Sequence, residues 1–288
     1  MPIFFMVVCS NQTGPTIFVA YLNKMKTTWV VQSNLLNSKD SEAIKVACAK
    51  HGHSFVPVRV KPFSSDLPEV STGSPTIFYG ATNFINNVYL NGQWIPGTFF
   101  HSTNFTIKAC MDHYKEHMLN YPCEFTTIGK FAQSHQPMDK QFFIRPDKDL
   151  KEFAGDVMDF NKMIRWERSI RHLPGCDNNP TLSTSTEIVV AEPVGIAHEW
   201  RLFLVNGRVS SGSHYRSYGK LTITYDLPER VRAYAEEMCR IWLPSQVFVM
   251  DVAESAGNLY IVECNCFNSS GFYYSDIEKI VVDISDLF

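Results

Sequence analysis

The sequence predicts an α/β N-terminal domain followed by an α+β second half, within a chain of 288 residues. Three observations support this prediction. Strand-like and helix-like segments alternate over residues 1–125, antiparallel hairpin signals follow that alternation, and two apolar runs near the C-terminus each reach a carboxylate. Alternating strands and helices are typical of a small domain with a largely parallel sheet, whereas hairpins combined with helices indicate an α+β arrangement.

The composition limits the kind of protein before any motif is considered. With 45% hydrophobic and 19% charged residues, the chain can bury one large or two modest cores. A formal net charge of −3 provides no general attraction to nucleic acid or to an acidic membrane. The eight cysteines are scattered without a CxxC pair, and the apolar run at Ile3–Val8 is too short to span a bilayer. We therefore expect a cytoplasmic protein with reduced thiols, no membrane partner and a first strand at Ile3–Val8.

Hydrophobic periodicity predicts the elements of residues 1–125. Apolar residues at Ala43, Ile44, Ala47 and Cys48 recur at three- and four-residue spacing, which indicates one face of a helix. Short apolar runs rich in β-branched and aromatic residues indicate strands. The strands are expected at Thr28–Gln32, Phe55–Val60 and Pro75–Tyr79, and the helices at Ser41–His51 and Asn104–Asn120.

The pattern changes after Pro122. A strand at Gln141–Arg145 leads through DKDLKEFAGDVMDF into a predicted helix, and the turn-forming residues over 175–186 predict a loop. Asn206-Gly207 between two alternating runs is the strongest hairpin signal in the chain. Further elements are expected as strands at Glu187–Ala191, Glu199–Val205 and Arg208–His214, and as a helix at 229–242.

Two carboxylates and an amide near the C-terminus form the strongest candidate site. Asp251 follows the apolar run VFVM, Glu263 follows LYIV, and Asn265 follows Glu263 by two residues. Because strand side chains alternate faces, Glu263 and Asn265 point the same way, and a turn at Gly257-Asn258 returns Asp251 beside them. Oxygen ligands of this kind suit a hard cation such as Mg²⁺. From the spacing alone, solvated strand ends or turn caps explain the three residues equally well.

Two other segments carry cations in apolar surroundings. Arg145, Lys148 and Lys151 gather at a strand end and a helix start, where they suit either phosphate oxygens or an ordinary charged helix face. Arg201 lies inside the apolar strand EWRLFLV, and its burial requires an anionic partner, either a ligand or a structural carboxylate. Arg216 offers a further phosphate contact. Each segment alone leaves both explanations open.

The order of these segments resembles that of an ATP-grasp enzyme. In that family a strand ending in a cation and proline precedes a phosphate-covering loop, a hinge strand contacts adenine, a glutamate seven residues further on binds the ribose, and a D…E-x-N set holds Mg²⁺. The matching positions here are Arg145-Pro146, Glu192-Pro193, Glu199, Asp251, Glu263 and Asn265. The segment RPDKDLKEFAG is also similar to a phage and bacterial clade of the family, named for one arginine and two lysines. The resemblance is dense over 141–274 and looser in IFYGATNF and PGTFFHSTNF before it.

The resemblance implies an ATP-grasp module of two lobes that enclose the nucleotide. After an N-terminal domain at 1–125, we expect a small lobe at 126–192 and a large lobe with the metal site at 193–288. The expected nucleotide contacts are the backbone of Glu192, Pro193 and Val194 for adenine, Glu199 for the ribose, and Arg145, Lys151, Arg201 and Arg216 for the phosphates. The resemblance also implies that Arg145, Lys151 and Arg201 act in catalysis, and that Asp251, Glu263 and Asn265 hold Mg²⁺.

The sequence departs from the family pattern at two points. The usual lysine before the proline is Arg145, which keeps the charge but replaces a point donor by a planar fork. The usual Gly/Ser-rich lid is replaced by Lys148–Gly155, so phosphate contacts there depend on Lys151. An earlier lysine that contacts ATP is either Lys130 or Lys140.

The implied activity is that of an ATP- and Mg²⁺-dependent ligase. A substrate carboxylate attacks the γ-phosphate, and an amine or similar nucleophile captures the resulting acyl phosphate. The substrate classes in view are an amino acid, a peptide and a modified macromolecule. Two alternatives stay open: a nucleotide-binding module without ligase activity, and an ATP-dependent enzyme that modifies nucleic acid. The second alternative is supported only by Arg165, Arg168 and Arg171, which share one face of a predicted helix.

Overall fold

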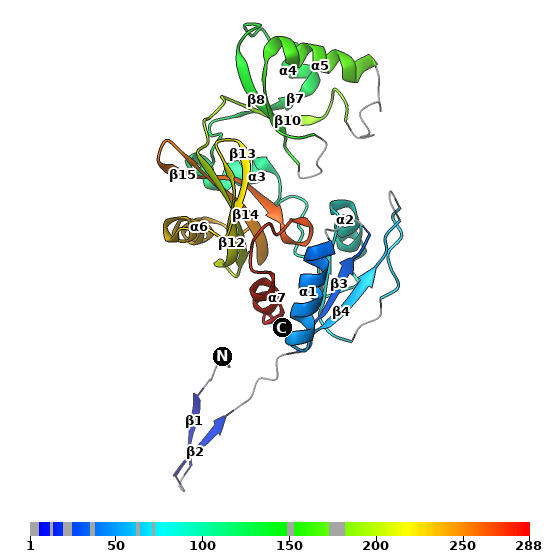
Figure 1. Ribbon diagram of the computed structural model, residues 1–288, viewed down its shortest axis with the longest axis vertical. Coiled ribbons are helices and arrows are strands. Elements are labelled where there is room, and N and C mark those ends of the chain that lie inside the picture. The colour runs from blue at the N-terminus through cyan, green and yellow to red at the C-terminus, as the bar shows by residue number, and fades with distance from the viewer. Residues whose placement is uncertain are drawn as a thin grey trace.

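Four β-sheets organise the part of the chain that the computed structural model describes, namely residues 6–11, 14–19, 25–34, 38–61, 64–70, 73–148, 153–172 and 182–288 (Figure 1). A two-stranded antiparallel hairpin consists of β1 (Met6–Asn11) and β2 (Gly14–Val19). The predicted strand at Ile3–Val8 overlaps β1, and its first three residues lie outside the described residues. Among the described helices, none combines the length and the hydrophobicity that a bilayer crossing requires.

The parallel sheet has the strand order β4-β3-β5-β6. Its central strand β3 (Thr28–Gln32) pairs in parallel with β4 (Ser54–Val58) and β5 (Thr76–Tyr79), and β6 (Pro96–Gly97) follows β5. All five residues of β3 are buried, because α1 (Ser38–Lys50) covers one face of the sheet and α2 (Thr82–Asn91) the other. The predicted α/β domain with a parallel sheet is confirmed.

The helix predicted at Asn104–Asn120 is shorter in the structure. It consists of α3 (Ile107–Tyr114) and a 3₁₀ turn, η1 (Lys115–His117). The Thr106 side chain caps the start of α3 by accepting a hydrogen bond from the Ala109 N–H at 3.0 Å. The α-helix ends at Lys115 because that residue adopts a left-handed φ of 49°.

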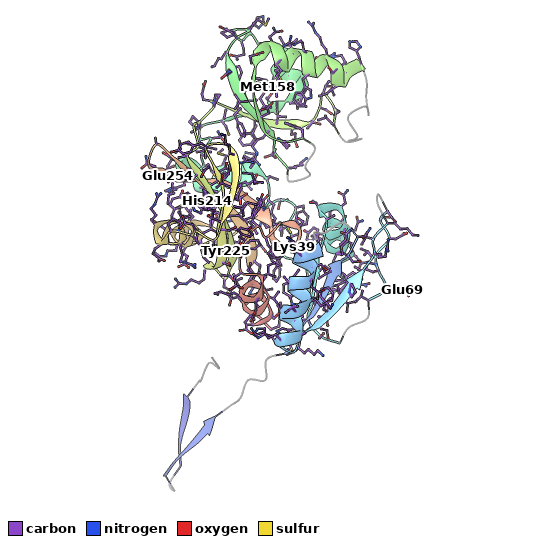
Figure 2. The ribbon with its side chains drawn as sticks, in the orientation of Figure 1. Lys39, Glu69, Met158, His214, Tyr225 and Glu254 are labelled. Carbon is purple, nitrogen blue, oxygen red and sulfur yellow. The ribbon has the colours of Figure 1, made fainter. Side chains whose placement is uncertain are left out.

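The small sheet has the order β7-β10-β8-β9 and carries its helices on one side. Its strands are β7 (Glu124–Thr127), β8 (Gln141–Pro146), β9 (Asp156–Asp159) and β10 (Glu187–Ala191), and its helices are α4 (Ile128–Ala132) and α5 (Phe160–His172). Phe131, Phe142 and Phe160 meet edge to face in the core between them, with Met158 beside them (Figure 2).

The sequence prediction was wrong directly after β8, where it expected the chain to continue into a helix. Residues 156–159 instead form β9, which pairs antiparallel with β8, and the helix begins only at Phe160. The Asp159 carboxylate accepts a hydrogen bond from the Lys162 N–H at 2.6 Å, as expected for a residue that precedes a helix. Residues 149–152 of this stretch, Lys151 among them, lie outside the described residues.

The large sheet is antiparallel, in the order β13-β12-β11-β14-β15. Its strands are β11 (His198–Val205), β12 (Arg208–Ser217), β13 (Lys220–Thr224), β14 (Val247–Ser255) and β15 (Asn258–Cys266). Helix α6 (Glu229–Ile241) packs on one face against Leu202 and Leu204. Helix α7 (Ile277–Ser285) packs on the other face against Phe203 and Val205, and it also contacts α1 of the parallel sheet.

The two carboxylates of the candidate site lie inside their strands, whereas the sequence predicted them at strand ends. Strand β14 continues from Asp251 to Ser255, and β15 continues from Glu263 to Cys266. The apolar run stops at each acid because these side chains lie on the α7 face of the sheet, beyond the part that Phe203 and the other α7 contacts cover.

Gly212 of β12 lies opposite Leu202 where the two strands approach closely. A Cβ added at Gly212 would lie 2.9 Å from the Arg201 carbonyl oxygen and 3.1 Å from Leu227. Because a backbone atom of a central strand cannot move away cheaply, we expect Gly212→Ala to lower the free energy of unfolding by about 1–3 kcal/mol, as other overpacked cores do.

Urea denaturation of Gly212→Ala beside Gly73→Ala tests this expectation. An added Cβ at Gly73 would meet nothing within 4 Å, so the control should change stability little. Equal unfolding midpoints for the two variants would show that β11 and β12 are not packed as described.

Candidate nucleotide and metal site

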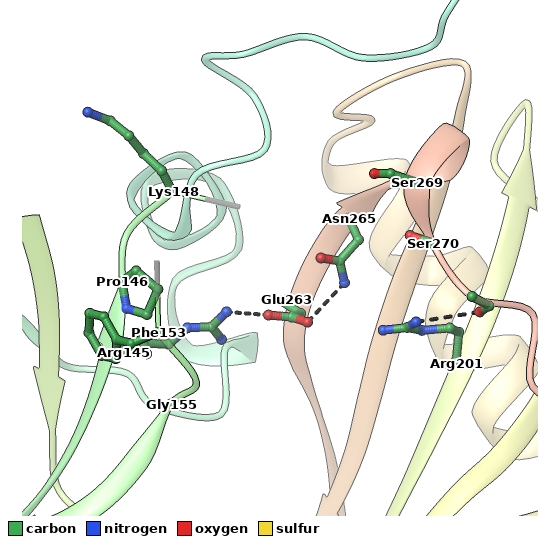
Figure 3. Close-up of a pocket in the computed structure, with 11 residues that line it drawn as sticks. Arg145, Pro146, Lys148, Phe153, Gly155, Arg201, Glu263, Asn265, Ser269 and Ser270 are labelled. Carbon is green, nitrogen blue, oxygen red and sulfur yellow. Dashed lines mark hydrogen bonds and ion pairs between the residues drawn. The ribbon is translucent and has the colours of Figure 1, made fainter. Parts of the chain in front are cut away.

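Two adjoining cavities lie between the small and large sheets. The first, of about 200 Å³, is lined by Pro146 and Phe153 from the small-sheet side and by Asn265 and Ser270 from the large-sheet side (Figure 3). The second, of about 380 Å³, extends toward the connection between β10 and β11. Both cavities are lined by Arg145, Gly155, Arg201 and Glu263.

A row of three charged side chains crosses the large sheet at these cavities. Arg201 of β11 lies opposite Asp251 of β14, and Asp251 lies opposite Glu263 of β15. Directly opposed residues present their side chains on the same face, so the strand register alone brings the three groups together. The Arg201 guanidinium forms a bidentate ion pair with Asp251, with Nε–Oδ1 and Nη2–Oδ2 distances of 2.8 and 2.7 Å.

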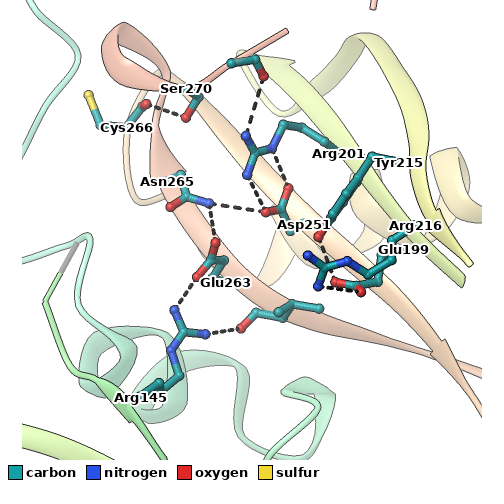
Figure 4. A network of polar contacts seen from close by, with 12 residues as sticks. Arg145, Glu199, Arg201, Tyr215, Arg216, Asp251, Glu263, Asn265, Cys266 and Ser270 are labelled. Atoms are coloured by element: carbon teal, nitrogen blue, oxygen red, sulfur yellow. Dashed lines mark hydrogen bonds and ion pairs between the residues drawn. The ribbon is translucent and has the colours of Figure 1, made fainter. Parts of the chain in front are cut away.

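Arg145 reaches this row from the small sheet. Its guanidinium forms an ion pair with Glu263 and donates a second hydrogen bond to the Val262 carbonyl at 3.4 Å (Figure 4). Val262 is an extra residue in β15, because Asp251 pairs with Glu263 while Val252 pairs with Ile261. A bulge of this kind takes one residue out of the strand pairing, which leaves the Val262 carbonyl available to Arg145.

The amide of Asn265 joins the two carboxylates. Its Nδ2 donates to Glu263 at 3.0 Å and to Asp251 at 3.4 Å, while its Oδ1 accepts no hydrogen bond from the described residues. Two carboxylates and an amide oxygen are a donor set that fits a hard divalent cation. No group of three or more His, Cys, Asp or Glu side chains suited to a metal occurs within the described parts of the chain, so a cation here requires the amide as well.

The two carboxylates differ in proton affinity. Burial raises the pKa of Asp251 to about 6, although the Arg201 guanidinium opposes this rise. Burial also acts to raise the pKa of Glu263, but Arg145 and the Asn265 amide outweigh it and lower that pKa to about 2. At neutral pH both groups are anionic, which suits a cation, and Glu263 holds its charge over the wider pH range.

Glu199 lies beside the row, in the second cavity, and is held at both oxygens. Tyr215 donates from its hydroxyl to Oε2 at 2.7 Å, and Arg216 donates from Nη1 to Oε1 at 3.2 Å (Figure 4). Glu199 pairs with Arg216 and Trp200 pairs with His214, so Tyr215 is the extra residue of a second bulge. The bulge explains how two consecutive side chains of β12 contact the same carboxylate.

The connection from β10 to β11 carries the three residues predicted to contact adenine. Glu192 and Pro193 are exposed, and Val194 lines the second cavity. Lys140 forms an ion pair with Glu192 at 3.0 Å, whereas Lys130 lies on α4 with its side chain exposed. Of the two lysines considered from the sequence, Lys140 is therefore the one that lies at this connection, and Lys151 lies outside the described residues.

Sequence reasoning missed the residues that fix the chain after Asn265. The buried Asn268 donates to the Phe78 carbonyl at 2.6 Å and accepts from the Phe99 N–H at 2.8 Å, which ties the loop to the parallel sheet. Tyr273, further along, stacks on Tyr215 with a centroid distance of 5.0 Å and an interplanar angle of 3°. The only sequence signal for these contacts is the polar and aromatic run FNSSGFYYS after the E-x-N pattern.

Comparisons with known proteins agree with this geometry. A family model described as an ATP-grasp domain, family 3 of one clade of that superfamily, matches residues 80–284, more than half of the 288-residue chain. A search of curated protein sequences finds no significant match.

Three solved structures show the extent of the structural likeness. The D-alanine–D-alanine ligase of Bacillus anthracis complexed with ATP has a TM-score of 0.56 and 12% identity, over 90% of this chain and 97% of that one. The macrocyclase MdnC of Microcystis aeruginosa, bound with the precursor peptide MdnA, has a TM-score of 0.55 and 11% identity, over 91% and 100%. The ligase PsnB, complexed with a precursor variant, Mg and ADP, has a TM-score of 0.51 and 11% identity, over 90% and 99%. At such identities the likeness establishes the shared fold.

Proposed function

The chain belongs to this family of ATP-grasp domains, and from this premise we propose that it is an ATP- and Mg²⁺-dependent ligase that joins a carboxylate to an amine or a similar nucleophile. One observation carries the proposal. The row of Arg201, Asp251 and Glu263 faces Arg145 across the cavities between the two sheets, so cations and a metal-binding donor set converge on one space.

The charges of this space suit the transfer of a phosphoryl group. Bound Mg²⁺ would supply charge neutralisation at the phosphates, and Asp251, Glu263 and the Asn265 amide oxygen are the groups that would hold it. Arg145 and Arg201 are the buried cations of the cavities, and in the proposal they exchange part of their contacts with the carboxylates for contacts with phosphate oxygens. No nucleophilic side chain is needed, because positioning and charge stabilisation accelerate this kind of transfer.

The proposed reaction has two steps. An oxygen of the substrate carboxylate attacks the γ-phosphorus of ATP, the bond to the β-phosphate oxygen breaks, and ADP leaves. The nitrogen of the amine then attacks the carbonyl carbon of the acyl phosphate, inorganic phosphate leaves, and the amine loses a proton. In both steps negative charge moves between oxygens that Arg145 and Arg201 can contact.

The remaining assignments are proposals of the same kind. We propose that the backbone of Glu192–Val194 contacts adenine with Lys140 beside it, that Glu199 binds the ribose hydroxyls, and that Lys151 and Arg216 assist at the phosphates. The division into 1–125, 126–192 and 193–288, with the nucleotide between the last two parts, belongs to this proposal. So do a cytoplasmic location, which the free thiols support, and the likeness of RPDKDLKEFAG to phage members of the clade.

The substrate class can be narrowed by analogy alone. One structural neighbour is named as a D-alanine–D-alanine ligase, and another is a macrocyclase bound with a precursor peptide. We therefore propose an amino acid or peptide as the first class to screen, with modified macromolecules second. The nucleic-acid alternative loses support, because Arg171 bonds the buried Glu167 and no longer belongs to a free basic face.

Calorimetric titration of ATP with and without Mg²⁺ tests the nucleotide and metal assignments together. We expect binding that requires Mg²⁺ and is lost with excess EDTA, because the cluster of three arginines and three carboxylates is formally neutral until a metal–nucleotide complex enters. An ADP-release assay with amino acids and short peptides then tests ligation. Mg²⁺-dependent ATP binding without ADP release from any mixture would favour the nucleotide-binding module, and absence of ATP binding by folded protein would refute the proposal.

A further inference from the structure

Tyr215 connects the proposed ribose and phosphate ends of the cavity. Its side chain is buried, with 6% of the residue exposed, and its hydroxyl donates to Glu199 at 2.7 Å. On the ring side, the guanidinium carbon of Arg201 lies 5.8 Å from the Tyr215 ring centroid and 5.1 Å from that of Tyr273. The ring is therefore held between a stacked aromatic partner and a buried cation.

The hydroxyl of Tyr215 is a permanent donor. Burial raises the pKa of the phenol well above its ordinary value, and the negative charges of Asp251 and Glu199 raise it further. A proton on Tyr215 therefore faces Glu199 at every physiological pH, and the carboxylate oxygen Oε2 always accepts it.

The second partner of Glu199 is less constrained. Arg216 has 45% of its side chain exposed, whereas Glu199 has 5%. A half-exposed arginine keeps much of its rotational freedom, so it neutralises the carboxylate without fixing its orientation. The hydrogen bond from Tyr215 is thus the contact that determines where the free lone pairs of Glu199 point.

We propose that Tyr215 is a positioning residue that orients Glu199 toward both ribose hydroxyls and thereby sets the preference for ATP over 2′-deoxyATP. The inference rests on the proposed function, since it takes Glu199 as the ribose contact. Each oxygen of Glu199 accepts one hydrogen bond from the protein and keeps one acceptor position, so a correctly turned carboxylate can accept from two neighbouring hydroxyls at once. A carboxylate that rotates cannot hold both.

The test compares the dissociation constants of ATP and 2′-deoxyATP, each with Mg²⁺, for wild type and Tyr215→Phe. The wild type should prefer ATP by about tenfold or more, which is the usual effect of one hydrogen bond to a charged group. Phenylalanine keeps the stack on Tyr273 and the contact with Arg201, but it should reduce this preference to about twofold or less.

Tyr234→Phe is the matched control, because Tyr234 donates to the His117 carbonyl at 3.2 Å, in a contact outside these cavities. It should leave the preference between the two nucleotides unchanged even if it lowers the melting temperature. Glu199→Ala and the double variant Glu199→Ala/Tyr215→Phe should show the same preference as each other, because Tyr215 acts through Glu199.

The outcomes separate the inference from the proposed function. Failure of the folded wild type to bind ATP refutes the proposed function itself. ATP binding in which Tyr215→Phe weakens both nucleotides equally, or in which the wild type binds both equally, leaves the proposed function standing and overturns the role of Tyr215.

Discussion

Replacing Glu263 by glutamine is expected to remove the Mg²⁺ dependence of ATP binding. The amide has the shape of the carboxylate but lacks its charge, so the proposed metal loses one of its two anionic ligands. Groups that only orient metal ligands are worth about 10–100-fold in metal affinity, so a direct ligand should be worth at least about 100-fold. The same substitution leaves Arg145 without its partner, which strengthens its attraction for phosphate in the absence of metal.

The measurement is the ratio of the ATP dissociation constants without and with Mg²⁺. In wild type this ratio should be large, and in Glu263→Gln it should approach one from both directions, as metal-free binding improves and metal-bound binding weakens. A Glu263→Gln protein that keeps the wild-type ratio would rule out Glu263 as a metal ligand.

Glu167→Gln provides the control for the loss of a buried ion pair. Glu167 is 5% exposed and bonds Arg171 within α5, so its substitution removes a comparable charge pair outside the cavities. We expect Glu167→Gln to lower stability while leaving the Mg²⁺ dependence of ATP binding at the wild-type value.

Replacing Arg201 by methionine is expected to cause the largest loss of stability among single substitutions at the site. Asp251 has 2% of its side chain exposed, and Arg201 supplies both of its charged hydrogen bonds. Removing one partner of a buried ion pair leaves an uncompensated charge, which costs about 3–5 kcal/mol. The free energy of unfolding from urea denaturation should fall by that amount.

The double variant Arg201→Met/Asp251→Asn separates the stranded charge from general damage to the sheet. Because asparagine removes the unpaired charge with little change of shape, the double variant should recover at least about half of the lost stability. Arg208→Met serves as the exposed counterpart, since Arg208 pairs with Glu236 but has 77% of its side chain exposed, and it should cost at most about 1 kcal/mol. A double variant as unstable as Arg201→Met alone would show that the ion pair is not the source of the loss.

Much of the fold was predictable because its signals are local. The strand at Thr28–Gln32 has the predicted bounds, and the helix expected at 229–242 is α6, one residue shorter at its end. In both segments the hydrophobic period matches the element formed, which makes the pattern informative. The ATP-grasp fold class, inferred from the order of motifs, is confirmed by the family match and by the structural neighbours.

The prediction failed where tertiary contacts outweigh local preference. DKDLKEFAGDVMDF contains good helix formers, yet its residues 156–159 pair with β8, because that pairing places Met158 in the small-sheet core. The long helix expected at Asn104–Asn120 is divided at Lys115, whose positive φ has no sequence signal of the kind that glycine provides.

For the site, the sequence by itself determined which chemical groups are available and that three of them share a strand face: Asp251, Glu263 and Asn265 come together because one hairpin with a tight turn at Gly257 sets their register. Only the tertiary structure decided their partners. Arg145 meets Glu263 across the gap between two sheets, and Arg201 meets Asp251 from a strand 50 residues away in the sequence. The two bulges that free the Val262 carbonyl and turn Tyr215 toward Glu199 depend on the same pairing of distant strands. Periodicity along one strand cannot encode an extra residue relative to its neighbour, so these contacts exist only once the strands are paired.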